Sequence, residues 1–212
     1  MRKMSHTNKQ LLPNSFFREN PLKEHSAAML TYASTCFARD DGFKEKMSKI
    51  AQEYIDDTRA ARIAQQRQQI EQTDAPDALI DLMRKCDRFN SALLSEKVAA
   101  YAEQTMPLLL KKYCTCLQDV FIELANLVLA RSDVRYTNTL RELYPQIRAP
   151  YAQAHACLTF GIQGMAQEIP FLLEQYHRFQ RDYPEESFSQ FPLLALYLLH
   201  GKSLHFPITS DL

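Results

Sequence analysis

A short motif returns three times at a nearly constant interval, and it constrains the fold of this chain more than any other feature. The motif is a leucine followed one helical turn later by a tyrosine, and its copies are Leu109/Tyr113, Leu140/Tyr144 and Leu172/Tyr176. Because of this offset, each leucine and its tyrosine lie on one face of a helix. Successive copies are about 30 residues apart, a period typical of helical repeat proteins. The outer two copies extend to the longer pattern apolar-Pro-apolar-Leu-Leu-x-x-Tyr, over residues 106–113 and 169–176.

One period has room for two helices, and the second helices align as well. Shifted by one period, Ala125-x-Leu127 becomes Ala156-x-Leu158, while an insertion at residues 181–186 lengthens the last unit. A single helix pair cannot cover both of its apolar faces, whereas stacked pairs cover each other. The period therefore predicts a short α-solenoid. The alternative is a plain helical bundle in which the similarity between the copies of the motif arose by chance.

The composition favours an all-α chain. Only 4 of the 212 residues are glycine, against an average of roughly 7%. β-Sandwiches, barrels and Rossmann domains need glycine in their turns and phosphate loops. No window of the sequence alternates in the manner of a half-buried strand, and apolar residues make up 46% of the chain, enough for a sizeable core.

The pattern along the chain predicts three segments that form one continuous structural unit. Residues 1–20 are polar apart from Phe16 and Phe17, which predicts a flexible N-terminal arm. Residues 21–75 form a helical N-terminal segment, with one helix over 21–39 and a longer one over 43–72. Residues 76–205 contain the helix pairs of the predicted solenoid, separated by short breaks.

The segment from Ala152 to Leu172 resembles a HEAT repeat, especially the short HEAT-like repeats of the bilin-lyase type. Those repeats read as Ala-x-x-Ala-Leu-Gly-x-x-Gly before a helix that opens with apolar-Pro-x-Leu, and Gly161, Gly164 and Pro170 occupy the matching positions. The resemblance covers about residues 91–201, and it is partial around Ala125, where Arg-Ser-Asp replaces the glycines. The resemblance implies a right-handed stack of helix pairs with a concave binding surface. It assigns no catalytic residue to this sequence.

Charge and cysteine usage exclude several classes of protein. Lys+Arg and Asp+Glu are both 25, so the basic face that nucleic-acid binding needs is not predicted. The five cysteines form an odd, scattered set, which favours reduced thiols and a cytoplasmic location. The longest apolar run, residues 192–199, is far short of the roughly 20 residues that span a bilayer, so no membrane association is predicted.

Two groups of residues have the chemistry of metal ligands but incomplete patterns. They are Cys114/Cys116 with His155/Cys157, and the Glu-x-x-His step Glu174/His177. Structural zinc sites favour Cys-x-x-Cys turns, and di-iron bundles need a second Glu-x-x-His step, neither of which occurs in this sequence. We therefore predict no metal, no cofactor and no catalytic residues.

The sequence predicts a non-enzymatic protein-interaction or scaffold module with an unidentified protein partner. The expected binding surface is the row of second helices near Asn126, Gln153 and Gln190. Residues 56–72, the second half of the helix over 43–72, offer only Ile63 and Ile70 as sizeable apolar residues on one face. This half therefore either packs onto the first helix pair near Leu79 and Met83 or docks onto another chain. The alternative function is a small all-α enzyme with a metal or cofactor site between its helices.

Overall fold

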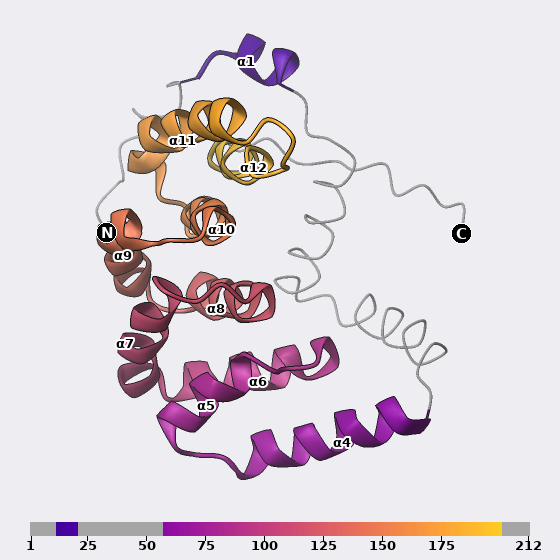
Figure 1. The fold of residues 1–212 in the computed structure, drawn as a ribbon. Coiled ribbons are helices and arrows are strands. Elements are labelled where there is room, and N and C mark those ends of the chain that lie inside the picture. The colour runs from indigo at the N-terminus through magenta and orange to yellow at the C-terminus, as the bar shows by residue number, and fades with distance from the viewer. Residues whose placement is uncertain (1–11, 21–56, 201–212) are drawn as a thin grey trace. The chain divides into compact units, whose positions relative to one another are not determined.

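The computed structural model describes residues 12–20 and 57–200, and all statements about structure below concern these residues (Figure 1). They contain helices and connecting turns and no strand, which confirms the all-α prediction. No helix in this part of the chain combines the length and the apolar character needed to cross a membrane. The predicted helix over 21–39 and the first part of the one over 43–72 lie outside the described residues.

Contacts divide the chain into two compact units, where the sequence predicted one continuous unit with boundaries at residues 20 and 75. The larger unit holds residues 30–156, and the smaller one combines residues 1–29 with 157–212. Residues 12–20 thus belong with the C-terminal helices, an arrangement that no local pattern in the sequence indicates.

The larger unit contains most of the helices. They are α4 (Asp57–Gln72), α5 (Pro76–Met83), η1 (Arg88–Asn90), α6 (Ser91–Ala100), α7 (Ala102–Tyr113), α8 (Asp119–Arg131), α9 (Val134–Leu143), η2 (Tyr144–Gln146) and the first half of α10 (Pro150–Ile162). Turn residues start several of them: Pro76 is in the first turn of α5, and the Asp133 carboxylate accepts a hydrogen bond from the Arg135 amide at 2.9 Å.

Successive helices of this unit pack in a regular way. α5 contacts α6 and α7, α6 contacts α8, α7 contacts α8, and α8 contacts α9. Figure 1 shows α7 and α9 along one side of the unit, with α6 and α8 beside them. Leu109 and Leu140 are completely buried, as the repeat predicts, and their tyrosine partners Tyr113 and Tyr144 are buried too.

Tyr113 also links α7 to α8 and α10. Its hydroxyl donates to the carbonyl oxygen of Ala152 in α10 at 2.8 Å, and the side-chain amide of Asn126 in α8 donates to the same hydroxyl at 2.9 Å. A buried phenol needs such partners, because an unsatisfied hydroxyl in the interior is costly. The repeated tyrosine therefore fills the core and also satisfies backbone of the following pair.

The smaller unit contains α1 (Asn14–Glu19), the end of α10, η3 (Ala166–Glu168), α11 (Ile169–Asp182) and α12 (Gln190–Leu199). α11 packs against α12, and Leu172 and Phe179 are fully buried. A Cβ placed on Gly161 would lie 2.5 Å from the Cα of Ala195, so α10 and α12 touch backbone to backbone here. Gly164 has a φ of 71° and ends the helix in the left-handed conformation that suits glycine.

The structure corrects the prediction of a flexible arm for the described part of residues 1–20. Residues 14–19 form α1, and Leu12 and Phe17 are buried. Polar composition favoured a frayed arm, but two adjacent phenylalanines supply enough apolar surface to hold a short helix against α11 and α12.

Candidate interaction surface

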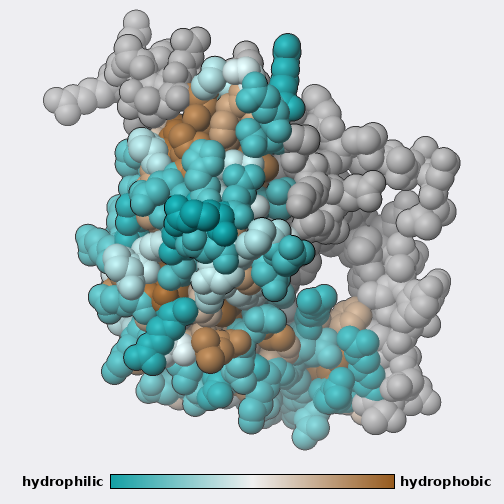
Figure 2. Space-filling view, turned by 45° about the horizontal axis from the view of Figure 1, so that its top comes forward, coloured by the Kyte–Doolittle hydropathy of each residue, from teal (hydrophilic) through white to brown (hydrophobic). Residues whose placement is uncertain are grey.

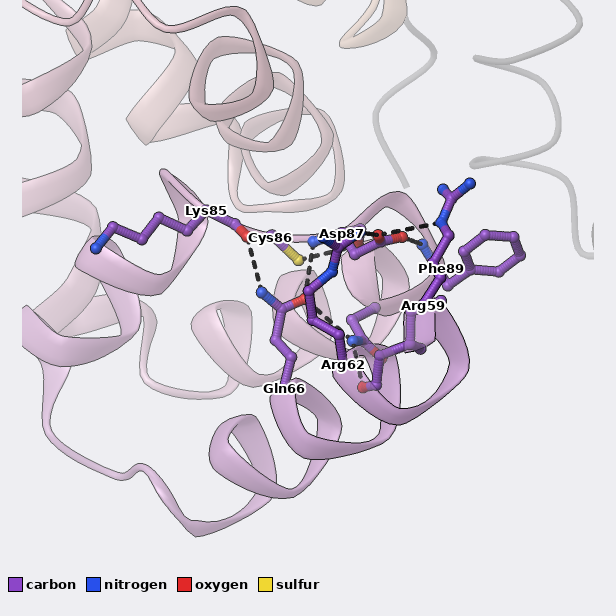
Figure 3. A network of polar contacts seen from close by, with 9 residues as sticks. Arg59, Arg62, Gln66, Lys85, Cys86, Asp87 and Phe89 are labelled. Carbon is purple, nitrogen blue, oxygen red and sulfur yellow. Dashed lines mark hydrogen bonds and ion pairs between the residues drawn. The ribbon is translucent and has the colours of Figure 1, made fainter. Parts of the chain in front are cut away.

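Gln66 of α4 connects that helix to the segment before η1 (Figure 3). Its Nε2 donates to the carbonyl oxygen of Lys85 at 2.8 Å, and its Oε1 accepts from the Asp87 amide at 2.7 Å and from Asn90 Nδ2 at 3.1 Å. Asn90 Nδ2 also donates to the carbonyl oxygen of Ile63 at 3.0 Å. These bonds fix η1 on α4 and set the direction of the side chains that η1 carries.

The two isoleucines of α4 resolve part of the question that the sequence left open. Ile70 is completely buried and Ile63 is partly buried, and α4 packs on α6 and η1 within its own unit. Lys97 of α6 donates to the carbonyl oxygens of Ile70 at 2.9 Å and Glu71 at 2.6 Å. The last carbonyls of a helix have no partner within it, and the last turn of α4 has no basic residue of its own. α4 therefore packs within its own unit on α6 and η1. The predicted contact with the first helix pair near Leu79 and Met83 and the alternative of docking onto another chain both stay predictions.

Phe89 of η1 is exposed, with Arg59 of α4 beside its ring. Its side chain is 38% exposed, and the guanidinium carbon of Arg59 lies 5.5 Å from the ring centroid. The carboxylate of Asp87 lies 3.8 Å from Arg59 Nε and 3.8 Å from Arg62 Nη2, and it also accepts from the Phe89 amide at 3.2 Å. Asp87 thus caps η1 and lies between Arg62 and Arg59, and Arg59 is the arginine next to the exposed ring (Figure 3).

The same contacts continue from η1 onto α8 and α10. Arg88 Nη2 lies 3.7 Å from Glu123 Oε2, and Tyr151 donates from its hydroxyl to Glu123 Oε1 at 3.0 Å. The rings of Tyr151 and His155 are 4.4 Å apart. We call the connected set the η1–α10 strip; it consists of Arg59, Arg88, Phe89, Glu123, Tyr151 and His155.

Exposed large apolar side chains are otherwise scattered over the described surface. They are Leu117, Val120 and Val134, besides Phe89. The face drawn in Figure 2 is mainly hydrophilic, with separate hydrophobic areas. Phe89 is the one among the four that lies within a connected set of charged and aromatic side chains, which is why the strip is the candidate site.

Burial controls the protonation of the strip's titratable groups. Burial, followed by the neighbouring Glu123 carboxylate, raises the pKa of the Tyr151 phenol far above its usual range. Burial also lowers the pKa of His155 to about 3. At neutral pH Tyr151 is therefore a neutral phenol and His155 a neutral imidazole.

The low pKa of His155 predicts a loss of stability in mild acid. The unfolded chain binds a proton on this imidazole near pH 6.5, whereas the folded chain does not until about pH 3, so stability falls as the pH drops below about 6.5. Between that pH and about pH 5 the loss is up to about 2 kcal/mol. Urea unfolding across this range should show it, and His155→Gln should flatten the dependence; an equally steep curve for the variant contradicts the assignment.

The structure places the three amides of the predicted binding surface mainly in the interior. Asn126 is 8% exposed and Gln190 is 5% exposed, and Gln153 is partly buried with its Nε2 donating to the carbonyl oxygen of Ile147 at 2.7 Å. Asn126 and Gln190 therefore do not form an exposed face, which corrects the prediction. Polar residues between core positions resemble a solvated stripe in sequence, but Asn126 bonds Tyr113 and Ile122 inside the unit.

The cysteines of this part of the chain are buried and form no disulfide: Cys86, Cys114, Cys116 and Cys157. Burial raises the pKa of Cys86 to about 11, so it is a neutral thiol at physiological pH and a weak nucleophile. Within residues 12–20 and 57–200, no group of three or more His, Cys, Asp or Glu side chains is arranged to hold a metal ion. Cys36 lies outside the described residues.

An open pocket of about 520 Å³ lies on the other side of Gln66, between α4 and α5. Its lining residues are Gln66, Gln69, Thr73, Ala78, Asp81, Leu82, Arg84 and Lys85. The pocket carries no histidine or cysteine, and Arg84 uses its Nε to donate to Gln118 Oε1 at 2.8 Å. The lining offers amides, a hydroxyl, one acidic residue and two basic residues as hydrogen-bonding groups.

The strip was missed at the level of sequence, although parts of it carried a signal. Tyr151 and His155 are one helical turn apart in a predicted helix and so share a face, and Phe89 is the aromatic residue of a charged run. The approach of Glu123 to both Arg88 and Tyr151 depends on packing of α8 beside η1 and α10.

Compared with known proteins, the chain matches no family model, no curated protein and no solved structure.

Proposed function

We propose that this chain is a non-enzymatic protein-interaction module made of stacked HEAT-like helix pairs. The pairs α7/α8, α9/α10 and α11/α12 each carry the Leu–Tyr motif, and all six motif side chains are buried. The contacts of α5 with α7 and of α6 with α8, together with the bond from Tyr113 to Ala152, support successive stacking. Arrays of this kind present extended surfaces for binding other proteins.

The binding surface that we propose is the η1–α10 strip, and the exposed ring of Phe89 carries the proposal. Aromatic residues and arginine dominate the energetics of protein interfaces, and the strip combines Phe89 and Tyr151 with Arg59 and Arg88. Gln66 and Asp87 hold η1 in place before any partner arrives, which reduces the ordering cost of association. A fitting partner offers an apolar pocket for Phe89 with carboxylates near the arginines.

The test compares Phe89→Ala with Leu117→Ala, a matched removal of an exposed apolar side chain outside the strip; Leu117 is 72% exposed. The wild-type chain is used to isolate its partner from the lysate of its source cells, and the purified partner is then titrated against both variants. We expect Phe89→Ala to lose affinity about 30-fold, the effect of a hot-spot residue worth about 2 kcal/mol. Leu117→Ala should bind as the wild type does.

Equal affinities for the two variants would reject the strip as the binding surface. Melting temperatures of both variants should match that of the wild-type chain, because both side chains are exposed. About one zinc or iron per purified chain in elemental analysis would instead favour the alternative of a small all-α enzyme.

A further inference from the structure

α1 is a six-residue helix, too short to form by itself in water, and aromatic contacts hold it against α11 and α12. The Phe17 ring lies 4.6 Å from the Tyr197 ring and 4.7 Å from the His200 ring. The Phe16 ring lies 5.9 Å from the ring of Tyr176. Two neighbouring rings of α1 thus contact both helices of the last pair.

Two tyrosine hydroxyls recognise the C-terminal end of α1. The Tyr197 hydroxyl lies 2.8 Å from the carbonyl oxygen of Phe17 and 3.1 Å from that of Asn20. Tyr176 donates to Asn20 Oδ1 at 2.6 Å and accepts from Gln180 Nε2 at 2.7 Å. The last carbonyls of a helix have no partner within the helix, so a donor placed here selects for a helix that ends at this point.

The repeated tyrosine suggests what this face is built to contact. Tyr113, in the first copy of the motif, donates to the backbone of α10, which belongs to the following helix pair. Tyr176 is the tyrosine of the last copy, and its hydroxyl donates instead to the side chain of Asn20 at the end of α1. By analogy with Tyr113, α1 takes on the last copy of the motif the place that α10 takes on the first copy.

We infer that this face of α11 and α12 is a binding site for a short helix with two adjacent phenylalanines and a C-terminal asparagine, supplied by a partner protein. In this chain α1 occupies the site as an internal ligand, and a partner helix of the same chemistry displaces it. Residues 21–56 connect Asn20 to the start of α4, so α1 competes as an attached segment. The apparent affinity for a partner helix equals the intrinsic affinity multiplied by the fraction of chains in which α1 is undocked.

The test uses the full chain and a labelled peptide of residues 10–22 as the probe. Phe16→Ala combined with Phe17→Ala in the protein empties the site, and we expect this variant to bind the peptide at least tenfold more tightly than the wild-type chain does. The same peptide carrying Phe17→Ala should bind the double variant with at least tenfold lower affinity. Adding Tyr197→Phe to the double variant keeps the ring but removes the hydroxyl, and it should weaken binding several-fold.

A folded double variant that does not bind the peptide overturns the inference, as does equal binding by the wild-type chain and the double variant. A second measurement covers the case in which the double variant fails to fold. Unlabelled peptide is added to the ¹⁵N-labelled wild-type chain, and the amide signals of residues 14–20 should move as α1 is displaced. Unchanged signals at millimolar peptide would show that α1 is a permanent cap and would also overturn the inference.

Discussion

Leu140→Ala is expected to lower the free energy of unfolding by about 2–5 kcal/mol, because the side chain is completely buried and its removal costs transfer free energy and leaves a cavity. Leu109→Ala and Leu172→Ala should give losses of the same size, since both leucines are also completely buried. Denaturant unfolding of the purified variants, monitored by circular dichroism, measures each change. A similar loss at all three positions would agree with equivalent sites in three repeats.

The matched control is Leu117→Ala, which removes the same atoms from an exposed position and should change stability by less than about 0.5 kcal/mol. A loss below about 1 kcal/mol for any of the three motif leucines would contradict its place as a core residue of the repeat, given the usual cost of such truncations.

Gly161→Ala is expected to destabilise the protein by about 3 kcal/mol, at the upper end for over-packing. The added methyl carbon would lie 2.5 Å from the Cα and 2.6 Å from the Cβ of Ala195. The nearest atom belongs to the backbone, so α10 and α12 have to move apart. Thermal unfolding of the full chain measures the effect.

Gly164→Ala provides the comparison within the same turn. No atom lies within 4 Å of the added carbon, and only the positive φ of 71° opposes the change, which costs roughly 1–2 kcal/mol. Ala195→Gly combined with Gly161→Ala should restore part of the stability and not all of it, because the clash with the Ala195 Cα remains. Equal losses for the two glycine variants would contradict a close backbone contact at Gly161.

These two glycines illustrate what a sequence motif states and what it leaves out. The HEAT-like pattern identified Gly161 and Gly164 as a pair at a turn, but their roles differ. Gly164 ends a helix, a local matter of backbone conformation, whereas Gly161 allows a distant helix to approach. Only coordinates separate the two, because the partner Ala195 is far along the chain.

The η1–α10 strip could be predicted only in fragments. The spacing of Tyr151 and His155 by one turn follows from helical geometry, and an aspartate before η1 is a recognisable cap. The approach of Glu123 to Arg88 and Tyr151 joins three segments that are far apart in the chain. Such contacts depend on how helices pack, for which the periodicity of a single helix carries no information.

The sequence by itself determined the helical class of this protein and the burial of the Leu–Tyr motif. These follow from local rules: few glycines, turn residues at helix ends, and apolar residues spaced by one helical turn. Tertiary structure alone decided that Asn126 faces inward, that α4 is held by Gln66, and that α1 docks on α11 and α12. The physical reason is that a polar or aromatic side chain satisfies its hydrogen bonds and covers its apolar surface with whichever partner the fold brings near.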